Sequence, residues 1–173
     1  MNHDMIGQVT STSQPLDFSG LNRLLVERHN LMNKHMAEGF TVLTKLNIFD
    51  NEFEGSITRT FTDIPSIEHL DMSGNYFEGT LEHSINMPMV KYLSLSNNKL
   101  SGSFPFSSMK TPMLEFLDLS ANRFTGNLPS SSNATPYLWS LNLNSNKISG
   151  DIPEWIPDQM NEIDFSDNRY VIC

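Results

Sequence analysis

Apolar and polar positions alternate in a pattern that recurs every 22 to 24 residues along most of the chain. Each period holds an apolar residue followed, three and five positions later, by two more, as in Leu114, Leu117 and Leu119. The final x-L-x-L alternation predicts a short β-strand with one buried and one exposed face. Six segments share the pattern: 43–48, 67–72, 90–95, 114–119, 138–143 and 160–165. Because so short a unit can bury its apolar side only against its neighbours, the pattern predicts a solenoid.

An asparagine follows each of these segments by three residues. We expect its side chain to turn inward, since a carboxamide has two donors and an acceptor for backbone groups left over where the chain leaves the strand. Such groups would cost about 1–3 kcal/mol each if they were buried without a partner. The sequence therefore predicts a buried asparagine ladder, made of Asn51, Asn75, Asn98, Asn122, Asn146 and Asn168.

Glycine and proline repeat in the same register. Five of the nine glycines follow a ladder asparagine by four residues: Gly55, Gly79, Gly102, Gly126 and Gly150. Glycine allows the φ values or the close backbone approach that the side opposite the strands needs. Proline closes the glycine segment in three repeats, at Pro105, Pro129 and Pro153, where no backbone donor is required.

The repeats LEFLDLSANRFTGNLP and LWSLNLNSNKISGDIP resemble the plant-type leucine-rich repeat family, and the resemblance covers about residues 43–170. It implies an α/β-type, right-handed solenoid of about six repeats, with a parallel β-sheet on the concave face and a 3-10 or irregular convex side. Thr58 and Glu82 depart from the pattern by replacing the proline, and the last repeat stops before its glycine.

Two regions follow from this pattern. Residues 43–173 form the predicted solenoid, whose last repeat is truncated. Residues 1–42 do not fit the repeat: the first fifteen or so are polar and predicted to be disordered, and apolar residues between Leu21 and Met36 predict a short amphipathic helix that caps the first strand. An alternative is a decayed repeat, because the LDFSG sequence at 16–20 echoes the LDLS strand.

Binding is expected on the outward strand positions, which a curved parallel sheet presents as one concave surface. His69, Tyr92 and Phe116 occupy one outward column on neighbouring strands, and Trp139 lies one position away on the next. Adjacent strands place such side chains in contact, so they form an aromatic ridge that could anchor a peptide. The alternative is that the rings only cover the sheet, since aromatic residues are frequent at this position in similar repeats.

The outward positions are also acidic. They hold two lysines, Lys45 and Lys91, against eight acids: Asp50, Glu68, Asp71, Glu115, Asp118, Glu162, Asp164 and Asp167. Together with a net charge of −9, this composition disfavours nucleic acid and anionic lipid and favours a cationic protein or peptide. A plainer alternative applies to Asp71, Asp118 and Asp164, because family repeats of the LDLSxN type commonly carry Asp there, where it solvates the strand.

Catalysis finds little support in the sequence. His69 and Asp71 share an outward face, with Ser73 and Ser94 nearby in register, but nothing supplies an oxyanion hole, and an exposed sheet is a poor place to tune a pKa. His69-x-Asp71 could hold a metal only weakly, and no zinc spacing or phosphate-binding glycine loop is present. We therefore expect no enzyme activity, no cofactor and no metal.

The compartment is left open by the sequence. No apolar run approaches the length of a membrane span, and the polar start lacks the apolar core of a signal peptide. Secreted members of the similar family carry paired cysteines in flanking caps, whereas Cys173 is the only cysteine here. A truncated chain is expected, with a complete cytoplasmic protein as the alternative. Asn133-Ala134-Thr135 is a glycosylation sequon and weakly favours an extracellular or cell-surface origin.

These observations favour a non-catalytic module that recognises a protein or peptide. The resemblance implies part of a receptor-like protein ectodomain with a role in signalling or plant defence. Two alternatives remain: an inhibitor of a secreted enzyme, as polygalacturonase-inhibiting members of the family are, and a truncated or structural fragment of a larger receptor or surface protein.

Overall fold

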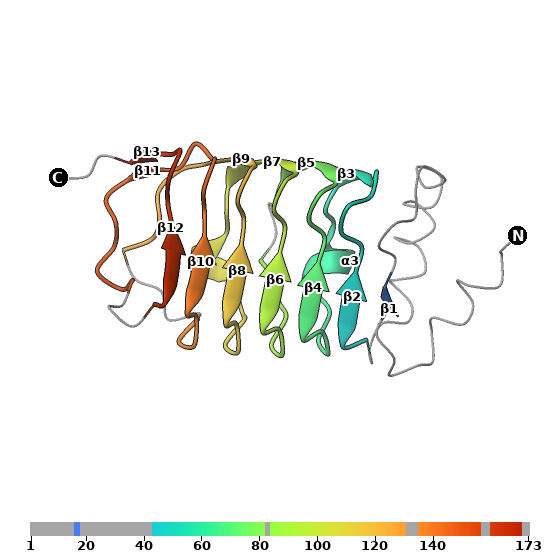
Figure 1. Cartoon of the computed structure of the whole chain (residues 1–173). Coiled ribbons are helices and arrows are strands. Elements are labelled where there is room, and N and C mark those ends of the chain that lie inside the picture. Colours follow the sequence, from blue (N-terminus) through green and yellow to red (C-terminus); the bar gives the residue numbers. More distant parts are fainter. Residues whose placement is uncertain (1–15, 18–42, 82–83, 131–134, 157–159, 171–173) are drawn as a thin grey trace, which may run out of the picture.

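The computed structural model describes residues 16–17, 43–81, 84–130, 135–156 and 160–170, and it shows a stack of coils that each contribute one strand to a parallel sheet (Figure 1). This sheet has seven strands in the order β1-β2-β4-β6-β8-β10-β12. Their bounds are β1 Leu16–Asp17, β2 Lys45–Asn47, β4 His69–Asp71, β6 Tyr92–Ser94, β8 Phe116–Asp118, β10 Ser140–Asn142 and β12 Glu162–Asp164.

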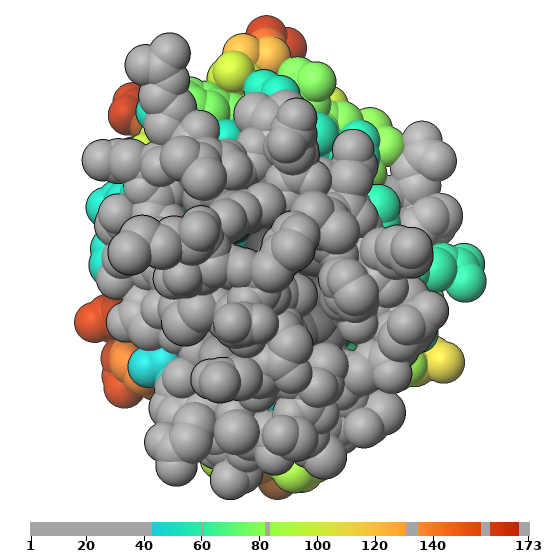
Figure 2. Space-filling view, turned by 90° about the vertical axis from the view of Figure 1, so that its right-hand side faces the viewer, coloured from blue at the N-terminus to red at the C-terminus, as the bar shows by residue number. Residues whose placement is uncertain are grey.

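The predicted alternation of buried and exposed strand positions is confirmed. The central leucines of β2, β4, β6, β8 and β10 are 1% exposed or less and lie opposite one another in register, while their neighbours on β4 and β8 are partly exposed. In the view along the stack, atoms of early and late repeats project together at the top of the molecule (Figure 2). In the seven-stranded sheet, equivalent residues of successive coils are paired in register and form columns.

The asparagine ladder is also confirmed, and Asn122 shows how it works. Its Nδ2 donates to the carbonyl oxygens of Leu95 at 2.8 Å, Leu119 at 3.2 Å and Ser120 at 3.1 Å, and its Oδ1 accepts from the Leu100 N–H at 3.0 Å. Leu95 and Leu100 belong to the preceding coil, so one side chain joins two coils. The same set of bonds recurs at Asn75, Asn98, Asn146 and Asn168.

Directly before each ladder asparagine, the backbone adopts a left-handed conformation. The column consists of Asp50, Gly74, Asn97, Ala121, Ser145 and Asp167, whose φ values lie between 51° and 63°. This conformation turns the chain so that the following asparagine points inward. Gly74, Asp50, Asn97 and Asp167 suit it, since glycine, Asn and Asp tolerate positive φ best, whereas Ala121 is strained there.

A second parallel sheet runs along another side of the solenoid and was not predicted. It has the order β3-β5-β7-β9, and β11 and β13 pair next to it in the last two coils (Figure 1). The bounds are β3 Glu54–Ser56, β5 Tyr76–Thr80, β7 Lys99–Ser103, β9 Arg123–Thr125, β11 Ser149–Gly150 and β13 Arg169–Tyr170. We call these strands the outer sheet.

The repeated glycines allow this outer sheet to form. Gly126 has φ +86°, and a Cβ at this position would lie 2.9 Å from the Ser103 Oγ of the preceding coil. Gly102 and Gly150 show the same combination of positive φ and close approach. Two coils carry a short helical turn in the described residues, α3 at Arg59–Thr62 and the 3-10 turn η3 at Phe106–Ser108, and the other connections are irregular, as the resemblance implies for the convex side.

The two ends of the stack differ from the middle. At the first end, β1 pairs in parallel with β2, with Leu16 opposite Leu46, which is the pairing that a decayed repeat requires. The amphipathic helix predicted between Leu21 and Met36 lies outside the described residues. At the other end, Ile163 of β12 is 39% exposed and Ile152 is 47% exposed, because no described coil packs on their C-terminal side.

Replacing a central ladder residue should destabilise the fold strongly. In Asn122→Ala the buried Leu100 N–H and the bonded carbonyl groups lose their partners, and we expect a loss of about 2–4 kcal/mol in the free energy of unfolding. Urea unfolding followed by circular dichroism measures this loss. The matched control Asn161→Ala removes an exposed carboxamide and should change stability by less than about 0.5 kcal/mol. Equal effects of the two substitutions would contradict the ladder's role.

Relieving the backbone strain in the left-handed column should raise the free energy of unfolding, in contrast to the loss expected for Asn122→Ala. Ala121→Asn should stabilise the protein by about 0.5–1 kcal/mol, because Asn tolerates φ near 51° better than Ala. Ala121→Val should destabilise it, since a β-branched side chain is disfavoured at positive φ. Both side chains are exposed at this position, so packing changes little. The ranking Asn, Ala, Val in thermal unfolding midpoints tests this explanation, and a reversed order would refute it.

Candidate functional site

The exposed face of the seven-stranded sheet carries a continuous column of rings. His69 stacks on Tyr92 with ring centroids 4.2 Å apart and planes 9° apart, and Tyr92 stacks on Phe116 at 4.5 Å and 3°. The three residues lie directly opposite one another on β4, β6 and β8, as the sequence predicts. Parallel strands hold the rings at the strand spacing, so the stack is preformed. We call these three residues the aromatic stack.

Trp139 is not brought into this stack. It precedes β10, its backbone N–H bonds to the Glu115 carbonyl oxygen at 3.0 Å, and its side chain is 39% exposed. Ser140 takes the column position next to Phe116. Its hydroxyl is buried and donates to Glu162 Oε2 at 3.1 Å, so the column ends in a hydrogen-bonded carboxylate.

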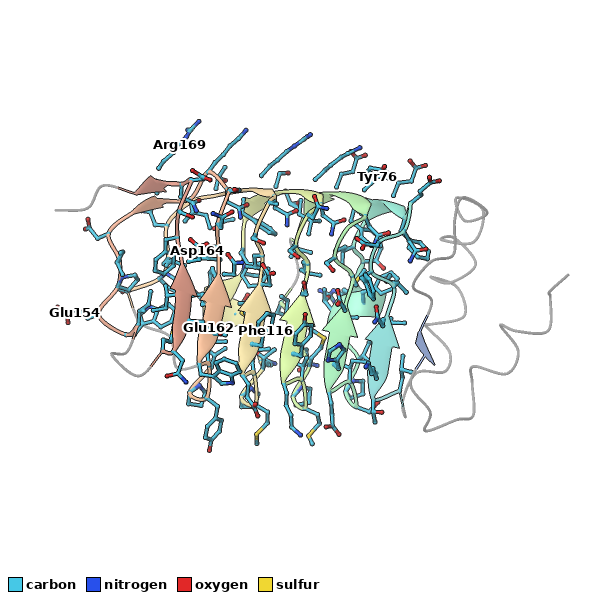
Figure 3. All side chains as sticks on the ribbon, viewed as in Figure 1. Tyr76, Phe116, Glu154, Glu162, Asp164 and Arg169 are labelled. Atoms are coloured by element: carbon cyan, nitrogen blue, oxygen red, sulfur yellow. The ribbon has the colours of Figure 1, made fainter. Side chains whose placement is uncertain are left out.

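A shallow pocket of about 380 Å³ opens where the aromatic stack ends. Figure 3 shows Phe116, Glu162 and Asp164 on the strands that border it. Its lining is completed by Ser140, Leu141, Asn142, Asn161 and Ile163. The repeat pattern of the sequence does not predict this pocket. The available signal was the small Ser140 in a column whose preceding members are rings, because a small side chain beside large ones leaves a gap.

The aspartates at the strand ends have a structural task. Asp71 Oδ1 accepts hydrogen bonds from the Ser73 N–H at 3.0 Å and the Ser73 hydroxyl at 2.6 Å. Asp118 Oδ1 accepts from the Ser120 N–H at 2.9 Å, and Asp164 bonds Ser166 in the same way. Each carboxylate thus fixes the turn that leads into the ladder asparagine. Asp71 and Asp118 were predicted as ligand-binding residues. Ligand binding stays a prediction and would be a second role beside fixing the turn.

Charge is distributed unevenly over this face. Lys91 forms an exposed ion pair with Glu68 at 3.0 Å, which leaves that end of the sheet nearly balanced. Around the pocket the charged residues are all acidic, namely Glu162 and Asp164, and Glu115 lies on the adjoining strand region. The hydrogen bonds from Ser166 lower the pKa of Asp164, so this carboxylate stays ionised at neutral pH.

The aromatic stack shifts the titration of its polar members. Burial, with a smaller contribution from Lys45, lowers the pKa of His69, although Asp71 opposes the shift. His69 is therefore neutral at pH 7. Burial followed by the charges of Asp71 and Asp118 raises the pKa of Tyr92, so its phenol keeps its proton. The stack presents neutral rings bordered by carboxylates.

Other predicted features bear on the site only indirectly. Among the described residues, no group of three or more His, Cys, Asp or Glu side chains is arranged to hold a metal ion. None of the helices in that part of the chain has the length and apolarity of a membrane span. Asn133 lies outside the described residues, so its glycosylation stays a prediction.

Comparison with known families now adds to this geometry. The sequence model described as Leucine Rich Repeat matches residues 66–87, 89–110, 113–133 and 137–158, which together make up about half of the chain. The chain belongs to the leucine-rich repeat family. The structure extends the repeats beyond the matched residues. Asn51 donates to the carbonyl groups of Ile48 and Phe49 in its own coil, and Asn168 makes the full set of ladder bonds.

Similar proteins place this leucine-rich repeat chain among plant-type members. It is 31% identical to Receptor-like protein 41 of Arabidopsis thaliana over 99 residues. These residues make up 56% of this chain and 11% of that protein. The chain spans about a tenth of the length of the curated relatives it matches. The structure of a pollen receptor kinase 3 superimposes with a TM-score of 0.67 at 28% identity, covering 80% of this chain and 67% of that one.

A further similar structure contains bound partners. It is the Arabidopsis receptor kinase HAESA in complex with the peptide hormone IDA and the co-receptor SERK1, with a TM-score of 0.59, 26% identity and coverage of 82% of this chain and 27% of that chain.

The lowered pKa of His69 makes the stability of this leucine-rich repeat depend on pH. The unfolded chain binds a proton near pH 6.5 more readily than the fold does, so the contribution of neutral His69 is present above that pH and is lost as pH falls through it. Unfolding free energies between pH 7.5 and 5 should therefore decline more steeply in the wild type than in His69→Gln. Identical slopes would show that His69 is not the responsible group.

Proposed function

We propose that this chain is a non-catalytic recognition segment of a receptor-like protein and that it binds a peptide or protein partner on the exposed, concave face of the seven-stranded sheet. Its similarity to Arabidopsis receptor-like proteins and to a receptor kinase in complex with a peptide hormone supports the class of function. The same similarity supports an extracellular or cell-surface location.

The aromatic stack is the observation that carries this proposal. Rigid, partly buried rings bind a partner at a low cost in side-chain entropy, because they are already held in place. The pocket next to Phe116 adds a recess for one side chain of the partner. A ridge followed by a recess matches an extended segment that lies across the strands, and the seven strands span only about 29 Å. The partner segment is therefore short.

The charges around the pocket favour a basic side chain in it. Glu162 and Asp164 line the recess, and the face of Phe116 forms another part of its wall. A lysine or arginine of the partner would meet carboxylates and an aromatic ring together, which is the combination that ion pairing and cation–π attraction both favour. We therefore propose a peptide with an apolar part over the stack and a basic residue in the pocket.

A displayed library of random peptides, selected on the whole chain, tests this proposal. We expect selected peptides to be enriched in basic and aromatic residues and to lose at least about tenfold in affinity when Tyr92, Phe116 and Trp139 are changed together to alanine. Glu162→Gln should weaken the basic peptides by a smaller factor, because it removes one charge at the pocket. Affinities are measured by calorimetry, and circular dichroism checks that each variant is folded.

Tyr76→Ala is the matched control, because Tyr76 is an exposed aromatic residue of the outer sheet. It should leave the affinity unchanged. If the selected peptides bind the triple variant with the same affinity as the wild type, the aromatic stack and Trp139 are not part of the binding surface.

A further inference from the structure

One column of the front face, which is the exposed face of the seven-stranded sheet, carries opposite charges at its two ends. Its members are the first residues of the strands from β2 to β12, and they are paired in register: Lys45, His69, Tyr92, Phe116, Ser140 and Glu162. The aromatic stack forms the middle of this column, between a lysine and a carboxylate. We call the six residues the dipolar column.

The two charges are separated by the whole width of the aromatic stack. Lys45 and Glu162 are five strand steps apart, which is about 24 Å at a strand spacing of about 4.8 Å. The ring centroids within the stack lie 4.2 and 4.5 Å apart, close to this spacing. Lys45 and the rings are partly exposed and Glu162 is exposed, so a segment that lies along the column contacts both of its ends.

Lys45 forms no ion pair with a carboxylate of the described residues. The ion pair found in that part of the chain joins Lys91 and Glu68, whose charges compensate each other beside the column. Lys45 lies directly opposite His69 on the neighbouring strand. Its charge is therefore available to an anionic group of a partner.

The titration of the rings indicates that the local field changes sign along the column. Burial lowers the pKa of His69 most, and Lys45 lowers it further by more than Asp71 raises it. Burial and then the charges of Asp71 and Asp118 raise the pKa of Tyr92. The positive charge thus dominates at His69 and the negative charges dominate at Tyr92, one strand further along.

We propose that the dipolar column fixes the direction of the bound segment, with a basic residue at Glu162 and an acidic residue at Lys45. This direction rests on the proposed function, because the same site binds the segment, and it adds a second charged anchor. Turned round, the segment would place its basic residue against Lys45 and its acidic residue against Glu162 and Asp164. Like charges brought together are penalised, so both ends of the column reject the wrong direction.

The length of the column also sets the spacing of the two charges in the partner. An extended chain rises about 3.4 Å per residue and presents every second side chain on the same face. Charges six residues apart therefore share a face at a distance of about 20 Å, and the flexible stems of lysine and arginine cover the remaining ~4 Å. Two more residues of that face then lie over the aromatic stack. Charges only two residues apart, at about 7 Å, cannot reach both ends.

Synthetic peptides with blocked ends test this spacing. The parent peptide carries arginine and aspartate six residues apart, tyrosine at the two same-face positions between them, and serine elsewhere. Its isomer has the same composition but carries the two charges two residues apart. We expect the parent to bind the whole chain at least about threefold more tightly at low salt. Fluorescence anisotropy at pH 8, where His69 is neutral, measures both affinities.

Charge exchange between the chain and the peptide tests the direction. Lys45→Glu should weaken binding of the parent peptide at least about fivefold, because an attraction becomes a repulsion. A peptide with lysine in place of its aspartate should recover most of this loss, whereas glutamate in place of its arginine should not. Lys110→Glu is the matched control: it reverses the charge of an exposed lysine outside the column and should leave the affinity unchanged.

One comparison needs no variant of the chain. A peptide with asparagine in place of the aspartate should bind the wild type at least about twofold more weakly than the parent does, since it has no charge for Lys45. Thermal unfolding checks that Lys45→Glu and Lys110→Glu keep the fold.

The proposal is overturned by equal affinity for the two isomers, by an undiminished affinity of the asparagine peptide or of folded Lys45→Glu, or by recovery with the peptide whose arginine is replaced. Failure of the proposed function gives a different result, in which the triple variant of Tyr92, Phe116 and Trp139 binds the parent peptide as well as the wild type does. If the triple variant loses binding while Lys45→Glu keeps it, the site stands and its direction is not set by the column.

Discussion

The hydrogen bonds between successive coils are the constraint on which the rest of this structure depends. Each ladder asparagine, such as Asn98, uses both ends of its carboxamide: it donates to carbonyl groups of two coils and accepts an N–H from the preceding one. These bonds fix the distance between coils at the strand spacing. Equivalent positions of the seven-stranded sheet then lie side by side in columns, and a column of one chemical kind, such as the aromatic stack, forms a continuous surface without any further folding.

The sequence predicts the parts of this fold that are buried. Strand leucines and the ladder asparagines can occupy few other environments, so their spacing identifies them. The outer sheet was missed because its strands lack this signal: β3, with Glu54, Gly55 and Ser56, has no apolar alternation, and its pairing follows from coil stacking and from glycines at positive φ. The left-handed column was missed for a related reason. Its members share no residue type: Asn97 favours a positive φ, whereas Ala121 does not, so the sequence carries no common signal for this conformation.

The part of the candidate site that was predictable consists of residues at equivalent positions of successive repeats. His69, Tyr92 and Phe116 share an outward position, and parallel register brings them together. The pocket depends instead on an interruption of a column, at Ser140, and on the conformation of Glu162, to which Ser140 bonds. The turn-fixing role of Asp71 and Asp118 also needed coordinates, because a solvated carboxylate and one that accepts a backbone N–H have the same sequence pattern.

Opposite charges on two sheets of one solenoid have a consequence for binding. The front face is acidic around Glu162 and Asp164, whereas Arg123 and Lys147 project from the outer sheet. The buried core and the ladder separate the two faces, so a partner on the front face would leave the outer sheet uncovered. The charges of the two faces interact only weakly at physiological salt, where the Debye length is about 8 Å.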